Sequence, residues 1–265
     1  MSRALVFDCD GVLADTERFG HLPAFNATFA AFGVPVRWTE AEYGEKLKIG
    51  GGKERMATLF EDPALVREAG LPTDADGQRA LLAEWHRHKT AVYKEIVRSG
   101  KLPARPGIAR VVVSALDAGW LLAVASTSAE ESVRAVLEHA VGPAQASRFS
   151  AVVAGDVVPR KKPDPAVYEL TLQTLGVAPE EAIAVEDSRN GLLAAVGAGM
   201  RTVVTVSSYT AEEDMSEAAL VVSSLGDPGE PARVLANRSA AVPAEMVELD
   251  DLEACLGVAI PEEPS

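Results

Sequence analysis

The sequence predicts an α/β fold in which a doubly wound parallel sheet is interrupted early by a helical insertion. From residue 102 onward, helical stretches alternate with short apolar strands, which is typical of a parallel sheet covered by helices on both faces. A separate apolar run, Ala4–Phe7, stands near the N-terminus before this alternation begins. Residues 17–100 lie between the two regions and show helical spacing without strand-like alternation. We therefore expect a Rossmann-like core with an inserted α-helical domain.

The first strand and the insertion set the domain boundaries. Ala4–Phe7 is a continuous apolar run with β-branched and aromatic members, which suits a strand buried on both faces. In the insertion, apolar residues recur at helical spacing from Ala24 to Phe32, and Thr39 precedes a second helix. Glycines and prolines break the remainder, at residues 50–52, 63, 70–72 and 77. We expect a core of residues 1–16 and 101–265 and a helical domain of residues 17–100.

The second half of the chain supplies the other strands of the predicted sheet. A last strand is expected at residues 218–222, followed by a tail rich in proline, glycine and acidic residues. In this tail we expect a short helix near Val234 and fraying beyond it. The alternating elements before the last strand are helices at 107–118, 130–139, 165–175 and 190–196, and strands at 121–125, 151–154, 182–185 and 202–206.

Composition excludes several classes of partner. The formal net charge of the 265 residues is −14, so nucleic acid and anionic membrane surfaces, which need clustered Lys and Arg, are not expected partners. The cysteines, Cys9 and Cys255, stand at opposite ends and form no disulfide framework, as in proteins of a reducing cytoplasm. No apolar run is long enough to span a bilayer. We expect a soluble cytoplasmic protein, and a monomer.

Two carboxylates follow the first strand directly. Asp8 and Asp10 are one residue apart and are followed by Gly11. Like charges at this spacing repel one another, so a shared proton or a metal cation must offset them. Turn chemistry at Asp10-Gly11 is the structural alternative. The other strand ends decide between these interpretations.

Polar side chains also follow three later strands of the predicted sheet. Since the carboxyl ends of parallel strands meet at one edge, these side chains should converge on one crevice. They are Ser126, Thr127 and Ser128 after the second strand, Arg160, Lys161 and Lys162 after the third, and Glu186 and Asp187 after the fourth.

This combination of residues suits phosphoryl transfer. Three carboxylates with carbonyls and waters match the octahedral oxygen shell of Mg²⁺. The ion and Lys162 would spread positive charge over phosphoryl oxygens, and Ser126 would donate a hydrogen bond to them. One aspartate of the first pair can then attack phosphorus, giving an aspartyl-phosphate. The other can protonate the departing oxygen and later deprotonate water.

The four strand-end groups, in this order, resemble the haloacid dehalogenase-like phosphatases. The resemblance covers the whole core and implies Asp8 as nucleophile and Asp10 as acid/base. It further implies that Ser126 and Lys162 hold the phosphate. The implied Mg²⁺ ligands are the Asp8 side chain, the Asp10 carbonyl and Asp187, with Glu186 beside the metal. A helical insertion directly after the first motif is similar to the cap domain of the β-phosphoglucomutase-like branch, which closes over the site and selects the substrate.

Local strings narrow the resemblance to the CbbY-type sugar-bisphosphate phosphatases, which hydrolyse xylulose-1,5-bisphosphate. The strings are Gly51–Arg55, Ser126–Ser128, Val158–Pro163 and Glu186–Gly191. A bisphosphate needs a second anion receptor, and the glycine run at 50–52 with Lys53 and Arg55 offers backbone N–H groups and charge. The resemblance thus implies that the substrate-binding residues are Glu17, Gly51, Gly52, Lys53, Arg55, Thr127, Ser128 and Arg160.

Several alternatives stay open at the level of sequence. A β-phosphoglucomutase-like mutase would use the same Asp8 and Asp10, and a phospho-accepting signalling module or a non-catalytic binding protein could share the fold. Asp10 and the insertion argue against a signalling module, which needs a long-lived acyl phosphate. Lys161 and Lys162 are hard to separate, although the proline after Lys162 favours it. An inert loop is about as compatible with the glycine run as an anion site is.

Overall fold

The computed structural model describes residues 3–49, 51–100 and 102–257, which form two compact units. One unit comprises residues 1–15 and 103–265 and is called the core unit here. The other comprises residues 16–102 and is called the helical unit. Among the described residues, no helix is both long and apolar enough to cross a membrane.

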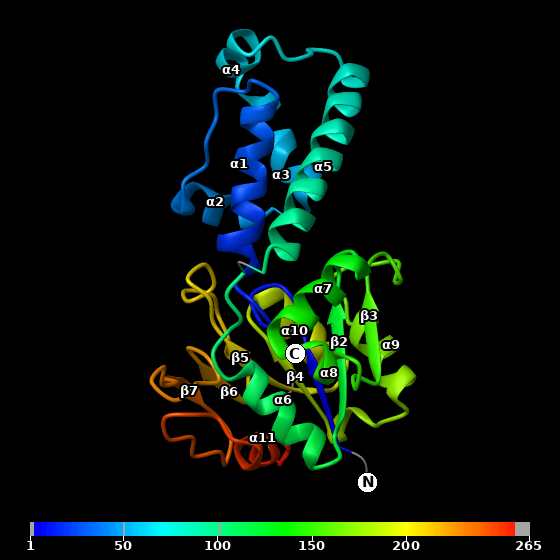
Figure 1. The fold of residues 1–265 in the computed structure, drawn as a ribbon, viewed down its shortest axis with the longest axis vertical. Coiled ribbons are helices and arrows are strands. Elements are labelled where there is room, and N and C mark those ends of the chain that lie inside the picture. Colours follow the sequence, from blue (N-terminus) through cyan, green and yellow to red (C-terminus); the bar gives the residue numbers. More distant parts are fainter. Residues whose placement is uncertain (1–2, 50, 101, 258–265) are drawn as a thin grey trace, which may run out of the picture. The chain divides into compact units, whose positions relative to one another are not determined.

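The core unit is built on a seven-stranded sheet in the order β3-β2-β1-β4-β5-β6-β7 (Figure 1). Every pairing up to β6 is parallel, and only the last pair, β6 with β7, is antiparallel. The α/β fold class predicted from the alternating elements is therefore confirmed. The strands are β1 (Ala4–Phe7), β2 (Leu121–Ser126), β3 (Ala151–Ala154), β4 (Ala182–Glu186), β5 (Arg201–Thr205), β6 (Leu220–Val222) and β7 (Val234–Asn237).

Helices cover both faces of this sheet. On one face, α9 (Ala166–Leu175) and α10 (Arg189–Gly197) pack against small apolar side chains of β1, β2 and β4. Helices α6 (Ile108–Asp117), α7 (Glu130–Val141) and α11 (Leu249–Leu256) pack on the other face, and the short α8 (Pro143–Ala146) follows α7. Burial on both faces explains why the central strands are continuous apolar runs rather than alternating ones.

The C-terminal tail differs from the sequence-based expectation. The segment near Val234 is the edge strand β7 instead of a short helix, and α11 follows where fraying was expected. β7 is largely exposed, so its strand conformation comes from pairing with β6 and not from burial of its own side chains. α11 buries Leu252 and Cys255 and contacts β4 and β5, which makes the tail part of the core.

Within the described part of the helical unit, all regular elements are helical. A π-helical turn, Glu17–His21, leads into α1, and Thr39 caps α2 through a capping box with Glu42. Gly77 does not break a helix as expected; its N–H donates to Asp74, the N-cap of α5. The α-helices are α1 (Leu22–Ala31), α2 (Glu40–Leu47), α3 (Gly52–Ala57), α4 (Pro63–Glu68) and α5 (Ala75–Arg98), with a 3₁₀ turn at Thr58–Glu61.

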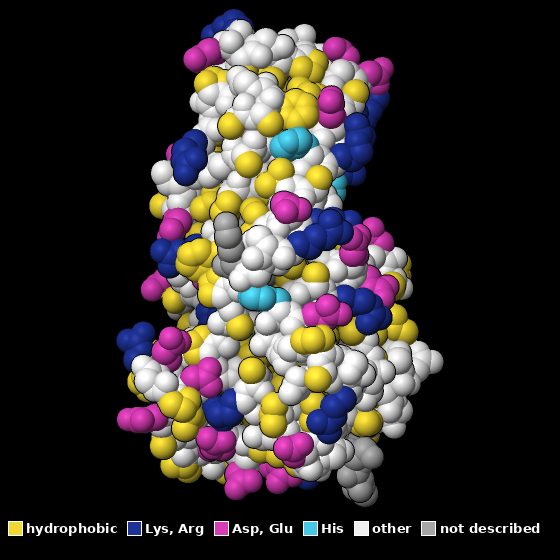
Figure 2. Space-filling view, in the orientation of Figure 1, with side chains coloured by type: hydrophobic (Ala, Val, Ile, Leu, Met, Phe, Trp, Pro, Cys, Tyr) yellow, Lys and Arg dark blue, Asp and Glu magenta, His cyan; other side chains and the backbone are white. Residues whose placement is uncertain are grey.

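Aromatic side chains form the core of the helical unit. Phe25 and Phe29 of α1 contact Trp38, with ring centroids 5.2 and 4.8 Å apart respectively, and Trp85 of α5 packs on Phe29 at 6.1 Å. This cluster explains how a unit of fewer than a hundred residues closes its own interior. On the face shown in Figure 2, basic and acidic side chains are interspersed rather than gathered into a single basic patch.

Candidate active site

Three adjacent strands bring several of the predicted site residues of the core unit to one edge of the sheet. In the central strand, Phe7 pairs with Val124 of β2 and with Val185 of β4, so Asp8 emerges between the ends of these two neighbours. The Asp8 N–H donates to the carbonyl of Val185 at 2.9 Å, which fixes the start of the loop. Ser126 ends β2 and is 2% exposed.

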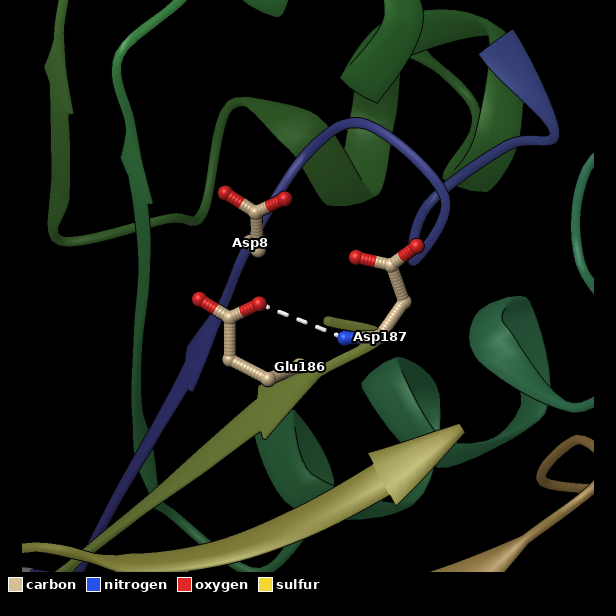
Figure 3. Close-up of side chains that lie close together, drawn as sticks. All are labelled: Asp8, Glu186 and Asp187. Carbon is tan, nitrogen blue, oxygen red and sulfur yellow. Dashed lines mark hydrogen bonds between the residues drawn. The ribbon is translucent and has the colours of Figure 1, made fainter. Parts of the chain in front are cut away.

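A buried group of carboxylates stands at this edge. Asp8, Glu186 and Asp187 each present an oxygen, and these oxygens lie within 4.8 Å of one another. Figure 3 shows the three carboxyl groups turned toward a common space, with the Asp187 N–H bonded to Glu186. All three residues are buried. The fold therefore brings together the carboxylates of the first and fourth predicted strand ends.

Two glycines leave room for these carboxylates. Gly11 has φ +80°, and a Cβ there would lie 2.1 Å from Asp187 Oδ2. A Cβ at Gly191, in the first turn of α10, would lie 2.0 Å from the carboxyl carbon of Glu186. Both distances are far below van der Waals contact. Gly11 was recognised from the sequence only as turn chemistry, and Gly191 only as part of a string.

Lys162 joins two of the carboxylates. Its Nζ lies 2.6 Å from Asp8 Oδ1 and 2.6 Å from Glu186 Oε1, and it donates to the carbonyl of Ala125 at 3.0 Å. Lys161, in contrast, is exposed and pairs with Asp156 at 3.4 Å. The geometry thus separates the two lysines and favours Lys162 as the functional one.

Tyr168 is a member of the site that the sequence analysis did not find. It lies on α9, is fully buried, and donates its hydroxyl to Glu186 Oε1 at 2.5 Å. Burial, with Glu186 nearby, raises the pKa of Tyr168 well above its usual value, so the hydroxyl keeps its proton. From sequence, Tyr168 is indistinguishable from the apolar residues of its helix, because its position only predicts burial.

The charged side chains in this group shift one another's pKa values. Burial raises the pKa of Asp8 to about 7; Lys162 opposes this, while Glu186 and Asp10 add to it. Burial works to lower the pKa of Lys162, but Asp8 and Glu186 outweigh it and hold that pKa well above the usual value. Lys162 is therefore a permanent cation, and the carboxylates around it exceed its charge.

The donor set fits a divalent cation. Asp8, Glu186 and Asp187 offer only carboxylate oxygens, the ligand type that hard cations prefer. Burial, together with the negative charges of Glu186 and Asp10, raises the pKa of Asp8, and a bound cation would lower it again. Because Glu186 Oε1 already accepts from Lys162 and Tyr168, the better-placed ligands are Asp8 and Asp187.

Asp10 is held by a residue of the second strand-end group. Ser128 Oγ donates to Asp10 Oδ2, and the Ser128 N–H donates to Ser126 Oγ at 3.1 Å. Thr127 between them is half-buried. The structure therefore brings Ser126 and Ser128 together with Asp10. The hydroxyl of Ser128, which was expected to bind substrate, contacts the expected acid/base in this structure.

The remaining predicted residue of the core unit lies apart from this group. Arg160 is exposed and forms an ion pair with Asp164 four residues later. Its guanidinium thus pairs with Asp164 and not with Asp8, Glu186 or Asp187. The sequence placed Arg160 in the site because it precedes Lys162 in the same string, but the loop turns the two side chains to different partners.

The predicted residues of the helical unit form their own polar group. Tyr43 donates to Glu17 Oε2 at 2.5 Å, and Arg55 donates to the Tyr43 oxygen at 3.1 Å and lies 3.8 Å from Glu17 Oε1. Lys53 is exposed. Gly51, with φ +101°, precedes α3, which begins at Gly52. Gly50, the first glycine of the predicted anion site, lies outside the described residues.

A family model independently matches most of the sequence of this chain. The model of the haloacid dehalogenase-like hydrolases matches residues 2–199, which contain all of the site residues described above. The chain belongs to the haloacid dehalogenase-like hydrolases. The match confirms the family resemblance seen in the strand-end motifs. The residues after 199 include β5, β6, β7 and α11 and lie beyond the matched region.

Similar proteins place this hydrolase within the family. It is 47% identical to a CBBY-like protein of Arabidopsis thaliana over 227 residues, which cover 86% of this chain and 70% of that protein. It is 41% identical to the protein CbbY of Cupriavidus necator over 231 residues, covering 86% of this chain and 88% of that protein. With such relatives, the hydrolase is a CbbY-like phosphatase.

A solved structure agrees with the fold of this hydrolase. The crystal structure of CbbY from Rhodobacter sphaeroides in complex with phosphate is 40% identical, with a TM-score of 0.72, covering 84% of this chain and 95% of that one. A mutant of the same protein was crystallised with xylulose-1,5-bisphosphate, at 39% identity and the same TM-score of 0.72. A putative β-phosphoglucomutase from Thermotoga maritima is 27% identical, with a TM-score of 0.58.

Proposed function

We propose that this protein is a Mg²⁺-dependent phosphatase of a small phosphorylated sugar and that Asp8 is its nucleophile. The observation that carries the proposal is the buried pairing of Asp8 with Lys162, at 2.6 Å, beside Glu186 and Asp187. A nucleophilic carboxylate that must approach a phosphate dianion needs positive charge next to it, and Lys162 supplies part of that charge.

The reaction divides between two aspartates. The carboxylate of Asp8 attacks phosphorus, and the sugar oxygen leaves, so that an aspartyl-phosphate forms on Asp8. Asp10 gives its proton to the departing oxygen and then takes a proton from the water that hydrolyses the intermediate. Ser128, which donates to Asp10 Oδ2, would orient this carboxyl group. Ser126 and Lys162 would hold the phosphoryl oxygens.

The metal would be held by the carboxylates at the strand ends. Asp8, Asp187 and the backbone carbonyl of Asp10 would be its protein ligands, with Glu186 beside it. When bound, Mg²⁺ neutralises charge on the phosphoryl group and on the attacking carboxylate. Lys162 and Tyr168 engage Glu186 Oε1 and so keep that carboxylate at the site.

Xylulose-1,5-bisphosphate is the substrate that the relatives favour most. Its complex with the Rhodobacter sphaeroides CbbY mutant supports this choice, since that protein is 39% identical over 84% of this chain. The second phosphate needs a further cationic group. We propose that the helical unit acts as the cap and supplies this cationic group. The candidates are Lys53, which is exposed, and Arg55, which lies near Glu17 and Tyr43.

A substrate panel tests the proposal. The protein is incubated with Mg²⁺ and either xylulose-1,5-bisphosphate or a set of sugar monophosphates that includes glucose-1-phosphate, and free phosphate is measured. We expect release of phosphate from the bisphosphate at the highest kcat/KM and none from Asp8→Asn. Interconversion of glucose phosphates without release would instead indicate a mutase. Undiminished phosphate release by Asp8→Asn would refute the nucleophile.

A further inference from the structure

Tyr168 belongs to the apolar core by its ring and to the active site by its hydroxyl. Its helix α9 covers β2 and β3, and the ring lies in a cluster with Val153, Val167 and Leu172. A phenylalanine would fill this position equally well if packing were its only purpose. The hydroxyl instead donates to Glu186 Oε1 at 2.5 Å.

The hydrogen-bond distances around Lys162 indicate which hydrogen bond of the Tyr168 hydroxyl is the main one. An ammonium group has three protons to donate. The three nearest acceptors of Lys162 Nζ are Asp8 Oδ1 at 2.6 Å, Glu186 Oε1 at 2.6 Å and the Ala125 carbonyl at 3.0 Å. The Tyr168 oxygen is farther away, at 3.3 Å. The main polar bond of Tyr168 is therefore the one it donates to Glu186.

Tyr168 thus limits the movement of both partners of the Lys162–Glu186 ion pair. Glu186 Oε1 accepts from Lys162 and Tyr168, and Oε2 accepts the Asp187 N–H at 3.2 Å. Without the tyrosine hydroxyl, Oε1 would keep only the lysine as a side-chain donor. The ring adds a second restraint, because Lys162 Nζ lies 4.8 Å from its centroid, within cation–π range.

We propose that Tyr168 is a positioning residue that, through Glu186, holds Lys162 against the phosphoryl group accepted by Asp8. The inference rests on the proposed function, in which Lys162 contacts phosphoryl oxygens. A lysine side chain has several rotatable bonds, so its ammonium keeps one position only when its acceptors are fixed. The buried hydroxyl of Tyr168 fixes one of those acceptors, Glu186 Oε1.

The first test removes only the hydroxyl. Tyr168→Phe keeps the ring, and therefore the packing and the cation–π contact. We expect kcat to fall about tenfold, as is typical when a partner behind an active-site ligand is lost. KM should rise by about twofold at most, in line with a small loss of phosphate affinity, since most of the effect concerns alignment in the transition state. Thermal unfolding is measured on the same samples.

Thr171→Val is the matched control. Thr171 lies in the same helix, is fully buried, and its hydroxyl donates to the Val167 carbonyl at 2.7 Å, within its own helix. Both variants remove one buried hydroxyl, but only Tyr168→Phe should lower kcat. The proposal is overturned if Tyr168→Phe retains the wild-type kcat, or if Thr171→Val lowers kcat to the same extent.

A binding measurement separates this inference from the proposed function. The affinity for inorganic phosphate with Mg²⁺ is measured by calorimetry, which needs no turnover. We expect Tyr168→Phe to weaken phosphate binding in the protein that contains Lys162, but to have no further effect in Lys162→Met. If Tyr168→Phe reduced phosphate affinity equally in the wild-type protein and in Lys162→Met, the proposal that Tyr168 acts through Lys162 would be overturned. A protein that hydrolyses no sugar phosphate but shows this coupling would contradict the proposed function alone.

Discussion

Asp8 illustrates how burial and neighbouring charges compete at a single residue. It is 8% exposed and adjoins Lys162, Glu186 and Asp10. Burial is the largest influence and raises the pKa of Asp8 to about 7, even though Lys162 lies 2.6 Å away. The nucleophilic role proposed for Asp8 requires an ionised carboxylate, so without a bound cation a substantial fraction of Asp8 would be unreactive near neutral pH.

This pKa predicts how the stability of the metal-free protein depends on pH. The folded-state pKa of Asp8, about 7, lies above the reference value of 3.8, so the folded state binds more protons between these pH values. The contribution of Asp8 to stability is complete below the lower value and is lost as pH rises through about 7. We expect urea melts in EDTA to show this decline, and Asp8→Asn to decline less. Parallel pH profiles for both proteins would contradict it.

Helix α10 leaves space for the carboxyl group of a residue on the neighbouring strand β4. Its first turn passes close to the carboxyl group of Glu186 at the end of β4. Only a residue without a side chain fits at Gly191, because Glu186 cannot move away without giving up Lys162 and Tyr168. The glycine is therefore required by packing against the site and not by the helix itself.

Gly191→Ala is expected to displace Glu186 and to lower kcat by about tenfold or more. The added Cβ would stand 2.0 Å from the Glu186 carboxyl carbon. Gly197→Ala in the same helix is the control, because its Cβ would meet Pro165 at an ordinary 3.5 Å. Steady-state kinetics and thermal melts compare the two variants. Equal activity of both alanine variants would show that Glu186 is free to move.

The core unit depends on a segment that lies beyond the family model's match. That match ends at residue 199, yet α11 packs on β4 and β5 near the middle of the sheet. Leu252 of α11 is fully buried, whereas Leu235 of the edge strand β7 is 52% exposed. The C-terminal residues therefore stabilise the sheet that supports the site, although they supply none of the site residues described above.

Leu252→Ala should lower the free energy of unfolding by about 2–5 kcal/mol, because it leaves a cavity against the sheet. Leu235→Ala should change it by less than about 0.5 kcal/mol, since that side chain is already exposed. Both variants should keep the wild-type kcat at temperatures where they are folded. Chemical denaturation measures the effect. A small effect of Leu252→Ala would mean that α11 does not complete the core.

The features that the sequence predicted correctly are those determined by residues adjacent in the chain. Apolar strands that end in Asp8 or Glu186 can be read from adjacent residues, and parallel topology then brings their ends together. Tyr168 and Gly191 could not be found in this way, because their roles depend on how α9 and α10 pack beside the Glu186 carboxyl group. β7 was assigned wrongly because pairing with β6 outweighs the weak preference of an exposed segment.

The position of β1 in the sheet has a consequence for the synthesis of the protein. β1 lies between β2 and β4, which follow it by more than a hundred residues along the chain, whereas residues 16–102 of the helical unit are continuous. A ribosome therefore releases the central strand first, completes the helical unit next and provides the neighbouring strands β2 and β4 only after that. A nascent chain that stops before β4 lacks Glu186 and Asp187, so the proposed site is completed only after β4 has been translated.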